Sequence, residues 1–141
     1  MKPLVFVDTG AWIALVVRDE PRNRQAQRFW ETRLADGTRF VTTNYVVSET
    51  ATWLRYRVGL ASALAFRDRV GIAAERSLVR LSRVEERADR DAWDLMEQYA
   101  DLRLSFVDAT SAVVARGSGV TEIFGFDGDF RALGFDVQPV G

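Results

Sequence analysis

The 141-residue sequence contains no cysteine and no histidine. The lack of cysteine excludes disulfides, thiolate nucleophiles and cysteine-bound zinc or iron–sulfur clusters. The lack of histidine excludes serine–histidine triads, histidine general bases and the usual zinc sites. An enzyme of this composition is left mainly with carboxylates and with the hard metal ions that carboxylates bind.

Long apolar runs and lysine are also scarce. No run approaches the roughly 20 residues that span a bilayer, and the start MKPLVFVD leads directly into fold-like sequence, so we expect a cytoplasmic protein. Of the 19 basic residues only Lys2 is lysine, and the net charge is −1. Arginine pairs with phosphate and stacks on bases, so arginines around an acidic pocket would suit a phosphodiester substrate.

The length and the apolar share of 48% fit a single globular domain, residues 1–141.

Short apolar runs alternate with helical patterns along the chain. The run LVFV is typical of a strand buried on both faces of a parallel sheet. The pattern predicts strands at residues 4–7, 39–43, 77–81, 121–126 and 135–140, the last at an edge. Since helices separate these strands, we expect an α/β fold: a three-layer α/β/α sandwich with a mostly parallel sheet of about five strands.

Six helices are predicted between these strands, and glycines are expected to end several of them. They cover residues 9–18, the segment from Pro21 to Gly37, and residues 45–58, 60–70, 82–100 and 105–117. Thr43 or Asn44 can cap the third helix, and Gly59 is expected to end it. Gly71 is expected to end the fourth, and Ser82 to begin the fifth.

Two aspartates directly follow predicted strands. Asp8 follows LVFV, and Asp127 follows IFGF. Parallel sheets bind ligands beyond the carboxyl ends of their strands, so both lie where a site is expected. Asp8 has an alternative role as a helix N-cap. In FGFDGDF we expect Asp129 to shape the turn or lie outside the site, and Asp127 to face it.

Two further acids lie on predicted helices. Glu49 shares a helical stripe with Tyr45, Val46 and Trp53, so it is expected to face inward, where a lone charge is costly; the alternative is a solvated glutamate. Asp108 lies in SFVDATSA on one face with Ser111 and small alanines. Its alternative is a capping box with Ser105.

Several carboxylates that converge on one cleft repel one another unless their pKa values rise or a cation binds between them. Oxygen-only ligand sets suit Mg²⁺ or Mn²⁺, which also dock substrate phosphates. Such an ion activates water for hydrolysis of a phosphodiester. The four acids Asp8, Glu49, Asp108 and Asp127 are therefore the candidate metal and catalytic residues.

Four motifs also carry a family resemblance across essentially the whole chain: VDTGAWIAL, TNYVVSET, LSFVDATSAVVA, and FDGDF with the LGF after it. They resemble the acidic motifs of PIN domains, most closely those of the VapC-type toxins of bacterial toxin–antitoxin pairs. The resemblance implies a metal-dependent endoribonuclease that cleaves single-stranded RNA on an α/β/α sandwich. It also implies a homodimer that a cognate antitoxin protein holds inactive.

The resemblance assigns roles residue by residue. It implies that Asp8 and Asp108 bind the metal most directly, that Glu49 and Asp127 complete the site directly or through water, and that Thr9 supports it with its hydroxyl. We add Ser111 and Asp129 around the acids, and the arginines expected to contact RNA are Arg55, Arg57 and Arg116. Two positions depart from the family pattern: Gly125 replaces a frequent Thr or Ser, and Gly10 a frequent Ser or Asn.

Three other classes of protein compete with this interpretation. A haloacid-dehalogenase-type phosphatase needs a second acid at position 10, which is Gly10. A receiver domain needs a lysine on a late strand, and the only lysine is Lys2. A non-catalytic PIN-like module that binds RNA or protein remains the main alternative to a nuclease. The segment TWLRYRVGLASALAF suits a dimer or antitoxin surface, but core packing is preferred for it, and the four tryptophans are assigned mainly to the core.

Overall fold

The computed structural model describes residues 3–140 and has a five-stranded sheet at its centre. The strand order is β3-β2-β1-β4-β5, and every strand pair is parallel. The strands are β1 (Leu4–Val7), β2 (Arg39–Thr43), β3 (Val79–Ser82), β4 (Glu122–Phe124) and β5 (Asp136–Gln138). The predicted sheet is thus confirmed, with β5 at an edge as expected.

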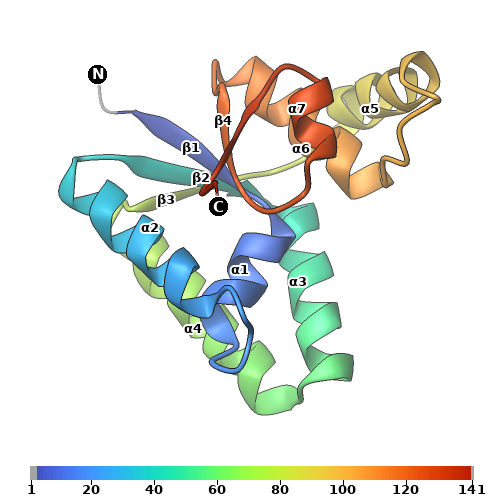
Figure 1. Ribbon diagram of the computed structural model, residues 1–141. Helices are drawn as coiled ribbons and strands as arrows, with labels where there is room; N and C mark the ends of the chain where they lie inside the picture. The colour runs from blue at the N-terminus through green and yellow to red at the C-terminus, as the bar shows by residue number, and fades with distance from the viewer. Residues whose placement is uncertain (1–2, 141) are drawn as a thin grey trace.

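Helices cover both faces of the sheet. They are α1 (Thr9–Val16), α2 (Asn23–Ala35), α3 (Asn44–Arg57), α4 (Leu60–Glu75), α5 (Glu86–Gln98), α6 (Phe106–Gly117) and α7 (Asp129–Ala132). Parallel crossovers are right-handed, so the steps β1 to β2 and β2 to β3 place α1–α4 on one face, and the reversed steps place α5–α7 on the other. Figure 1 shows α1–α4 below the sheet and α5–α7 above it, which confirms the three-layer α/β/α sandwich.

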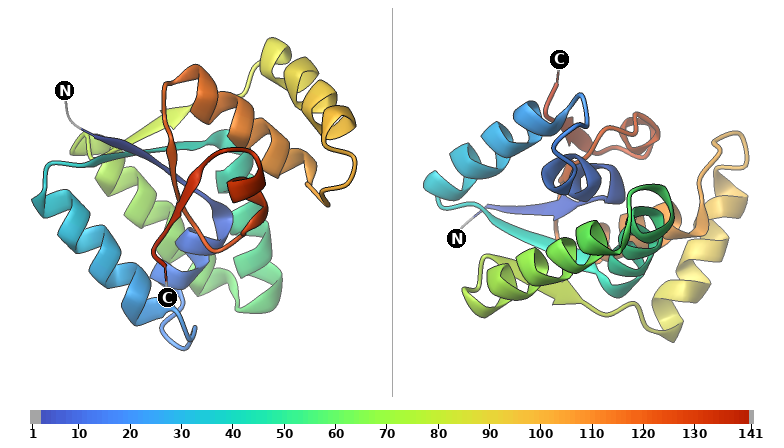
Figure 2. Two further views of the ribbon diagram at one scale, coloured as in Figure 1. Left: turned by 45° about the horizontal axis from the view of Figure 1, so that its top comes forward. Right: turned by 90° about the horizontal axis from the view of Figure 1, so that it is seen from below.

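Aromatic side chains pack α1, α2 and α4 onto the lower face, which Figure 2 (right) shows from below. The rings of Trp30 and Phe40 are stacked with centroids 4.3 Å apart, and Trp12 contacts both Trp30 and Phe66. The Trp12 indole also donates a hydrogen bond to Thr42 Oγ1 (3.3 Å). Since Trp12 is fully buried, these contacts fix the first turn of α1, directly after Asp8.

Two of the predicted helix starts are confirmed by their caps. Thr43 Oγ1 accepts a hydrogen bond from the Val46 N–H (3.1 Å) at the start of α3. At the start of α6, Ser105 and Asp108 form a complete capping box, each side chain accepting from the other's backbone N–H (3.0 Å). Local hydrogen bonding of this kind is readable from sequence because both partners lie within one turn.

Several boundaries differ from the prediction. The strand predicted at residues 121–126 ends at Phe124, so Asp127 lies three residues beyond β4 rather than directly after it. Gly71 does not end α4, which continues to Glu75 because burial of Ala73 outweighs the roughly 1 kcal/mol that glycine costs inside a helix. Ser82 does not begin a helix, since it is the last residue of β3 and pairs with Thr43; α5 begins only at Glu86. The short helix α7 was not predicted.

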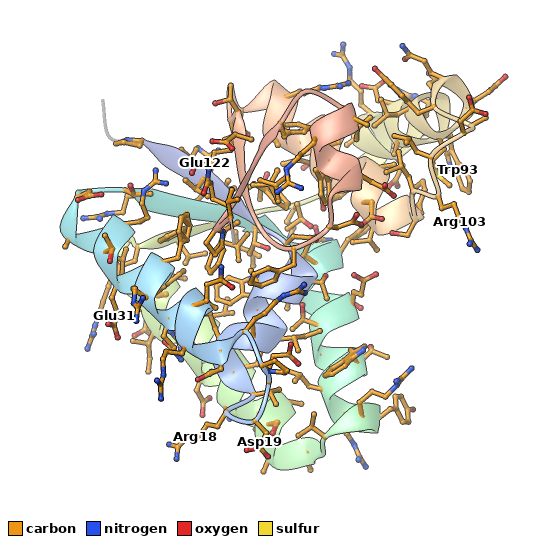
Figure 3. All side chains as sticks on the ribbon, viewed as in Figure 1. Arg18, Asp19, Glu31, Trp93, Arg103 and Glu122 are labelled. Atoms are coloured by element: carbon orange, nitrogen blue, oxygen red, sulfur yellow. The ribbon has the colours of Figure 1, made fainter. Side chains whose placement is uncertain are left out.

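The expected core packing of the tryptophans and of the segment 52–66 is wrong in part. Trp93 is 60% exposed, at the outer edge of the molecule in Figure 3. Leu54 and Phe66 are buried, but the corner between α3 and α4 exposes four large apolar side chains, which we call the corner patch: Tyr56, Val58, Leu60 and Leu64. Among residues 3–140, no helix is long and apolar enough to cross a membrane.

Candidate active site

The four predicted acids come from four different elements that meet at the carboxyl end of the sheet. Asp8 follows β1 and Asp127 follows β4, on either side of the point where the strand order reverses. Glu49 lies in the second turn of α3, and Asp108 in the first turn of α6. The starts of α1, α3 and α6 converge here (Figure 1). This is the position at which parallel α/β sheets bind ligands.

Asp8 is the most strongly perturbed of the four acids. The residue is only 5% exposed, and burial is the main cause that raises its pKa from 3.8 to about 7. The charges of Asp108, Glu49 and Asp127 raise this pKa further, and the backbone N–H of Thr9 offsets part of the rise. Because all three other acids act on Asp8, the four carboxylates share one local field.

The capping alternative for Asp8 is not supported. Asp8 stands at the N-cap position of α1, but its side chain makes no capping hydrogen bond. Its Oδ1 atom is buried and has no hydrogen-bond partner. A buried carboxylate oxygen without a partner is costly, so the local fold alone does not explain Asp8.

Asp108 both caps its helix and faces the other acids. Its Oδ2 accepts from the Ser105 N–H (3.0 Å), which leaves Oδ1 as the oxygen available to a ligand. Burial raises its pKa, the hydrogen bond from Ser105 lowers it, and the charges of Asp127 and Glu49 raise it. The two predicted roles of Asp108 are therefore compatible.

The turn in FGFDGDF is made by a different aspartate from the one expected. Asp127 Oδ1 accepts a hydrogen bond from the Asp129 N–H (2.9 Å), and Asp129 is the first residue of α7. The turn role expected for Asp129 thus belongs to Asp127, because an Asx side chain bonds the backbone two residues ahead of it. Asp127 still acts on Asp8 and Asp108 through its charge.

Glu49 is half-buried rather than enclosed. The stripe it belongs to is apolar, as predicted, since Val46 is fully buried and Trp53 packs against the core. Glu49 lies on the wall of a groove beside Tyr45 and Trp53. Its carboxylate is thereby accessible from solvent.

Three buried side-chain oxygens of the described chain have no hydrogen-bond partner: Asp8 Oδ1, Thr9 Oγ1 and Ser111 Oγ. All three belong to residues predicted to form or support the site, and buried polar groups are otherwise nearly always paired. Oxygen atoms of this kind suit a hard cation and the water that accompanies it. The residues present therefore fit Mg²⁺ or Mn²⁺. Within residues 3–140, however, no three acids lie close enough to form a finished ligand set, so side chains would have to turn to share one ion.

The two glycines that depart from the family pattern differ in their surroundings. A Cβ atom at Gly125 would lie 3.1 Å from Asp8 Cβ, which is tighter than ordinary packing, so the chain directly after β4 can pass this close to Asp8 because position 125 has no side chain. A Cβ at Gly10 would lie 3.8 Å from the Phe126 ring, an ordinary contact. A side chain at position 125 would therefore press on Asp8, whereas one at position 10 would not.

The predicted RNA-contacting arginines have different environments. Arg55 and Arg57 are exposed on α3, with the Arg57 guanidinium 6.0 Å from the centre of the Trp53 ring. Arg116 donates to the Leu133 carbonyl (2.7 Å), which gives it a structural role and weakens the support for RNA contact. The sequence did not single out Arg22 as a residue near the site. Its guanidinium lies 4.6 Å from the centre of the ring of Phe126, the residue that directly precedes Asp127. Nothing in the sequence connects residues 22 and 126.

The fold is a parallel α/β/α sandwich that carries four acids at the carboxyl end of its sheet, beside the point where the strand order reverses. Comparison with known sequences identifies the family of proteins to which it belongs. Residues 5–136 match the PIN domain, and the chain belongs to the PIN domain family.

Named relatives are similar over nearly their whole length. The 23S rRNA-specific endonuclease VapC20 of Mycobacterium tuberculosis, from strains CDC 1551 / Oshkosh and ATCC 25618 / H37Rv, is 36% identical over 139 residues, which cover 96% of this chain and 99% of the relative. The crystal structure of Mycobacterium tuberculosis VapC20, described as a sarcin–ricin loop cleaving toxin, superposes with a TM-score of 0.81 at 35% identity. The superposition covers 93% of this chain and 95% of the VapC20 chain.

Proposed function

We propose that this protein is an endoribonuclease that hydrolyses phosphodiester bonds of single-stranded RNA with the help of Mg²⁺ or Mn²⁺. The observation that carries the proposal is Asp8: a buried carboxylate with an unpaired oxygen and three further acids around it. A non-catalytic binding module would gain nothing from such repulsion. Membership of the PIN family and the named activity of the relatives support the same conclusion.

Each acid has a distinct role in this proposal. Asp8 and Asp108 would hold the ion most directly, and Glu49 and Asp127 would complete the set and orient the attacking water. When bound, the ion lowers the pKa of water and neutralises charge on the phosphodiester. The hydrogen bonds that fix one oxygen each of Asp108 and Asp127 keep their carboxylates oriented. The Thr9 and Ser111 hydroxyls can donate to these carboxylates or to the water.

The proposed substrate is an exposed loop of large-subunit ribosomal RNA. The relatives are named for 23S rRNA and for the sarcin–ricin loop, and the similarity covers nearly the whole chain. The proposed biological role is that of a toxin controlled by a cognate antitoxin. We further propose a homodimer, for which the corner patch supplies exposed apolar surface.

Cleavage of a synthetic RNA hairpin of the sarcin–ricin loop tests the proposal, with a scrambled single strand of equal length for comparison. The wild type should cut the hairpin in Mg²⁺ or Mn²⁺, EDTA should stop the reaction, and Asp8→Asn or Asp108→Asn should abolish it while the fold persists. Asp19→Asn is the matched control, because Asp19 is exposed and lies three residues beyond the C-terminal end of α1. Wild-type rates for the two site variants would refute the assignment. Binding of RNA without any cut would favour the binding module.

A further inference from the structure

An open groove between α3 and α6 adjoins the acidic site. Its volume is about 480 Å³, and its lining residues are Tyr45, Ser48, Glu49, Thr52, Trp53 and Val107. Glu49 belongs both to this groove and to the acidic set around Asp8. The groove is therefore continuous with the site rather than a separate depression.

The walls of the groove are aromatic and already held in place. Tyr45 donates its hydroxyl to Asp89 Oδ1 (2.8 Å), and its ring lies 6.2 Å from that of Phe106. Trp53 packs partly against the core, so its ring has little freedom to collapse into the groove. The lining also includes Ser48 and Thr52, whose hydroxyls offer both donors and acceptors. A flat group with polar edges fits such a setting.

Three residues of α3 form a row that leads away from the acids. Glu49, Trp53 and Arg57 are spaced four residues apart, so they lie on one face of the helix along roughly 12 Å of its axis. The row presents a carboxylate, an indole ring and a guanidinium in order. An RNA strand that places one phosphate at the acids would thus meet an aromatic surface next and a cation after it.

We propose that this groove binds one unpaired nucleobase of the RNA substrate, adjacent to the scissile phosphate, with Trp53 as its stacking surface. The proposal rests on the proposed function and adds a specificity-determining site to it. The volume of the groove lies in the range of small-ligand pockets. Four of the large exposed apolar residues, which would suit a protein partner, form the corner patch, and none of these four lines the groove.

The test combines removal of the Trp53 ring from the protein with removal of one base from the RNA. Hairpin RNAs carrying a single abasic nucleotide at each position beside the cleavage site are cut by the wild type and by Trp53→Ala. One abasic position should lower wild-type kcat/KM by roughly 5- to 100-fold, the range expected for loss of one stacked base. Trp53→Ala should lose a similar factor on intact RNA and then be insensitive to that abasic position. Trp53→Phe should keep most of the rate and the sensitivity.

Ile72→Ala is the control, because Ile72 is a 49% exposed apolar residue on α4 outside the groove. It should keep both the wild-type rate and the sensitivity to the abasic position. Additive losses for Trp53→Ala and the abasic RNA, or normal cleavage by Trp53→Ala, would overturn the proposal; the second result would instead leave the groove to a protein partner.

Binding measurements separate this proposal from the proposed function. Fluorescence anisotropy measures the binding of labelled intact and abasic RNAs to proteins that carry Asp8→Asn, with and without Trp53→Ala. These variants give the same comparison without cleavage. Binding that depends on both Trp53 and the base, in a protein that never cuts RNA, would refute the nuclease and keep the base site. Cleavage without coupling between Trp53 and the base would refute the base site alone.

Discussion

Replacement of Asp8 by asparagine should stabilise the metal-free protein, by an amount that grows with pH. Burial and the three neighbouring acids raise the pKa of Asp8 from 3.8 to about 7. The unfolded chain therefore releases this proton near pH 4, whereas the folded chain holds it up to about pH 7. Between these values the folded state binds more protons, so the stability of the wild type falls as pH rises.

The magnitude follows from the same pKa. A rise from 3.8 to about 7 costs the wild type about 4 kcal/mol at pH 8, but only about 2 kcal/mol at pH 5, where folded Asp8 remains protonated. Asparagine has the same shape and no charge, so it escapes this cost. Its unpaired amide carries a penalty that does not change with pH. The gain from Asp8→Asn should thus be about 2 kcal/mol larger at pH 8 than at pH 5.

Urea unfolding in EDTA at pH 5 and pH 8, followed by circular dichroism, measures both gains. Asp19→Asn is the control, because Asp19 is exposed beyond the C-terminal end of α1 (Figure 3) and its loss should change stability by less than about 0.5 kcal/mol at either pH. An equal effect of Asp8→Asn at the two pH values, or a net loss of stability at pH 8, would refute the account of a buried charge in an acidic field.

The remaining predictions concern the metal, the glycines and the corner patch. Addition of excess Mg²⁺ should raise the melting temperature of the wild type but not that of Asp8→Asn, because an ion that binds only the folded state stabilises it. Equal shifts in the two melting temperatures would place the ion elsewhere. Gly125→Ala should lower the free energy of unfolding by about 1–3 kcal/mol and slow cleavage, because the new Cβ pushes on Asp8. Gly10→Ala should instead raise the free energy of unfolding by roughly 0.5–1 kcal/mol and keep activity. The opposite order of the two stabilities in urea unfolding would refute the steric argument. Leu60→Glu, on the corner patch, should yield a monomer by light scattering with stability unchanged within about 0.5 kcal/mol; a dimer that persists would place the interface on another surface.

Sequence alone predicts the features that depend on neighbours in the chain. The apolar run of β1, the Thr43 cap and the Ser105–Asp108 capping box all act within a few residues, and all are found as expected. The errors arise where distant contacts decide. Gly71 stays helical because Ala73 is buried in the core, and Ser82 is a strand residue because it pairs with β2.

The candidate site shows the same division. The four acids could be named from their positions after strands and on helix faces, but their mutual influence on Asp8 is a tertiary property. The groove beside Glu49 joins two helices about 60 residues apart in the chain, so no local pattern reveals it. The same holds for the contact of Arg22 with Phe126.

Among the four acids, Asp8 distinguishes best between a structural and a catalytic explanation. Asp108 and Asp127 each make a local hydrogen bond that would justify an aspartate without any ligand. Glu49 is half-buried at the wall of a groove, where a solvated glutamate is acceptable. Asp8 has neither justification, because it is buried, its Oδ1 is unpaired and its charged form is disfavoured at neutral pH. A fold retains such a residue at a cost of several kcal/mol only if something bound at the site recovers that cost, and a divalent cation shared among these acids does so.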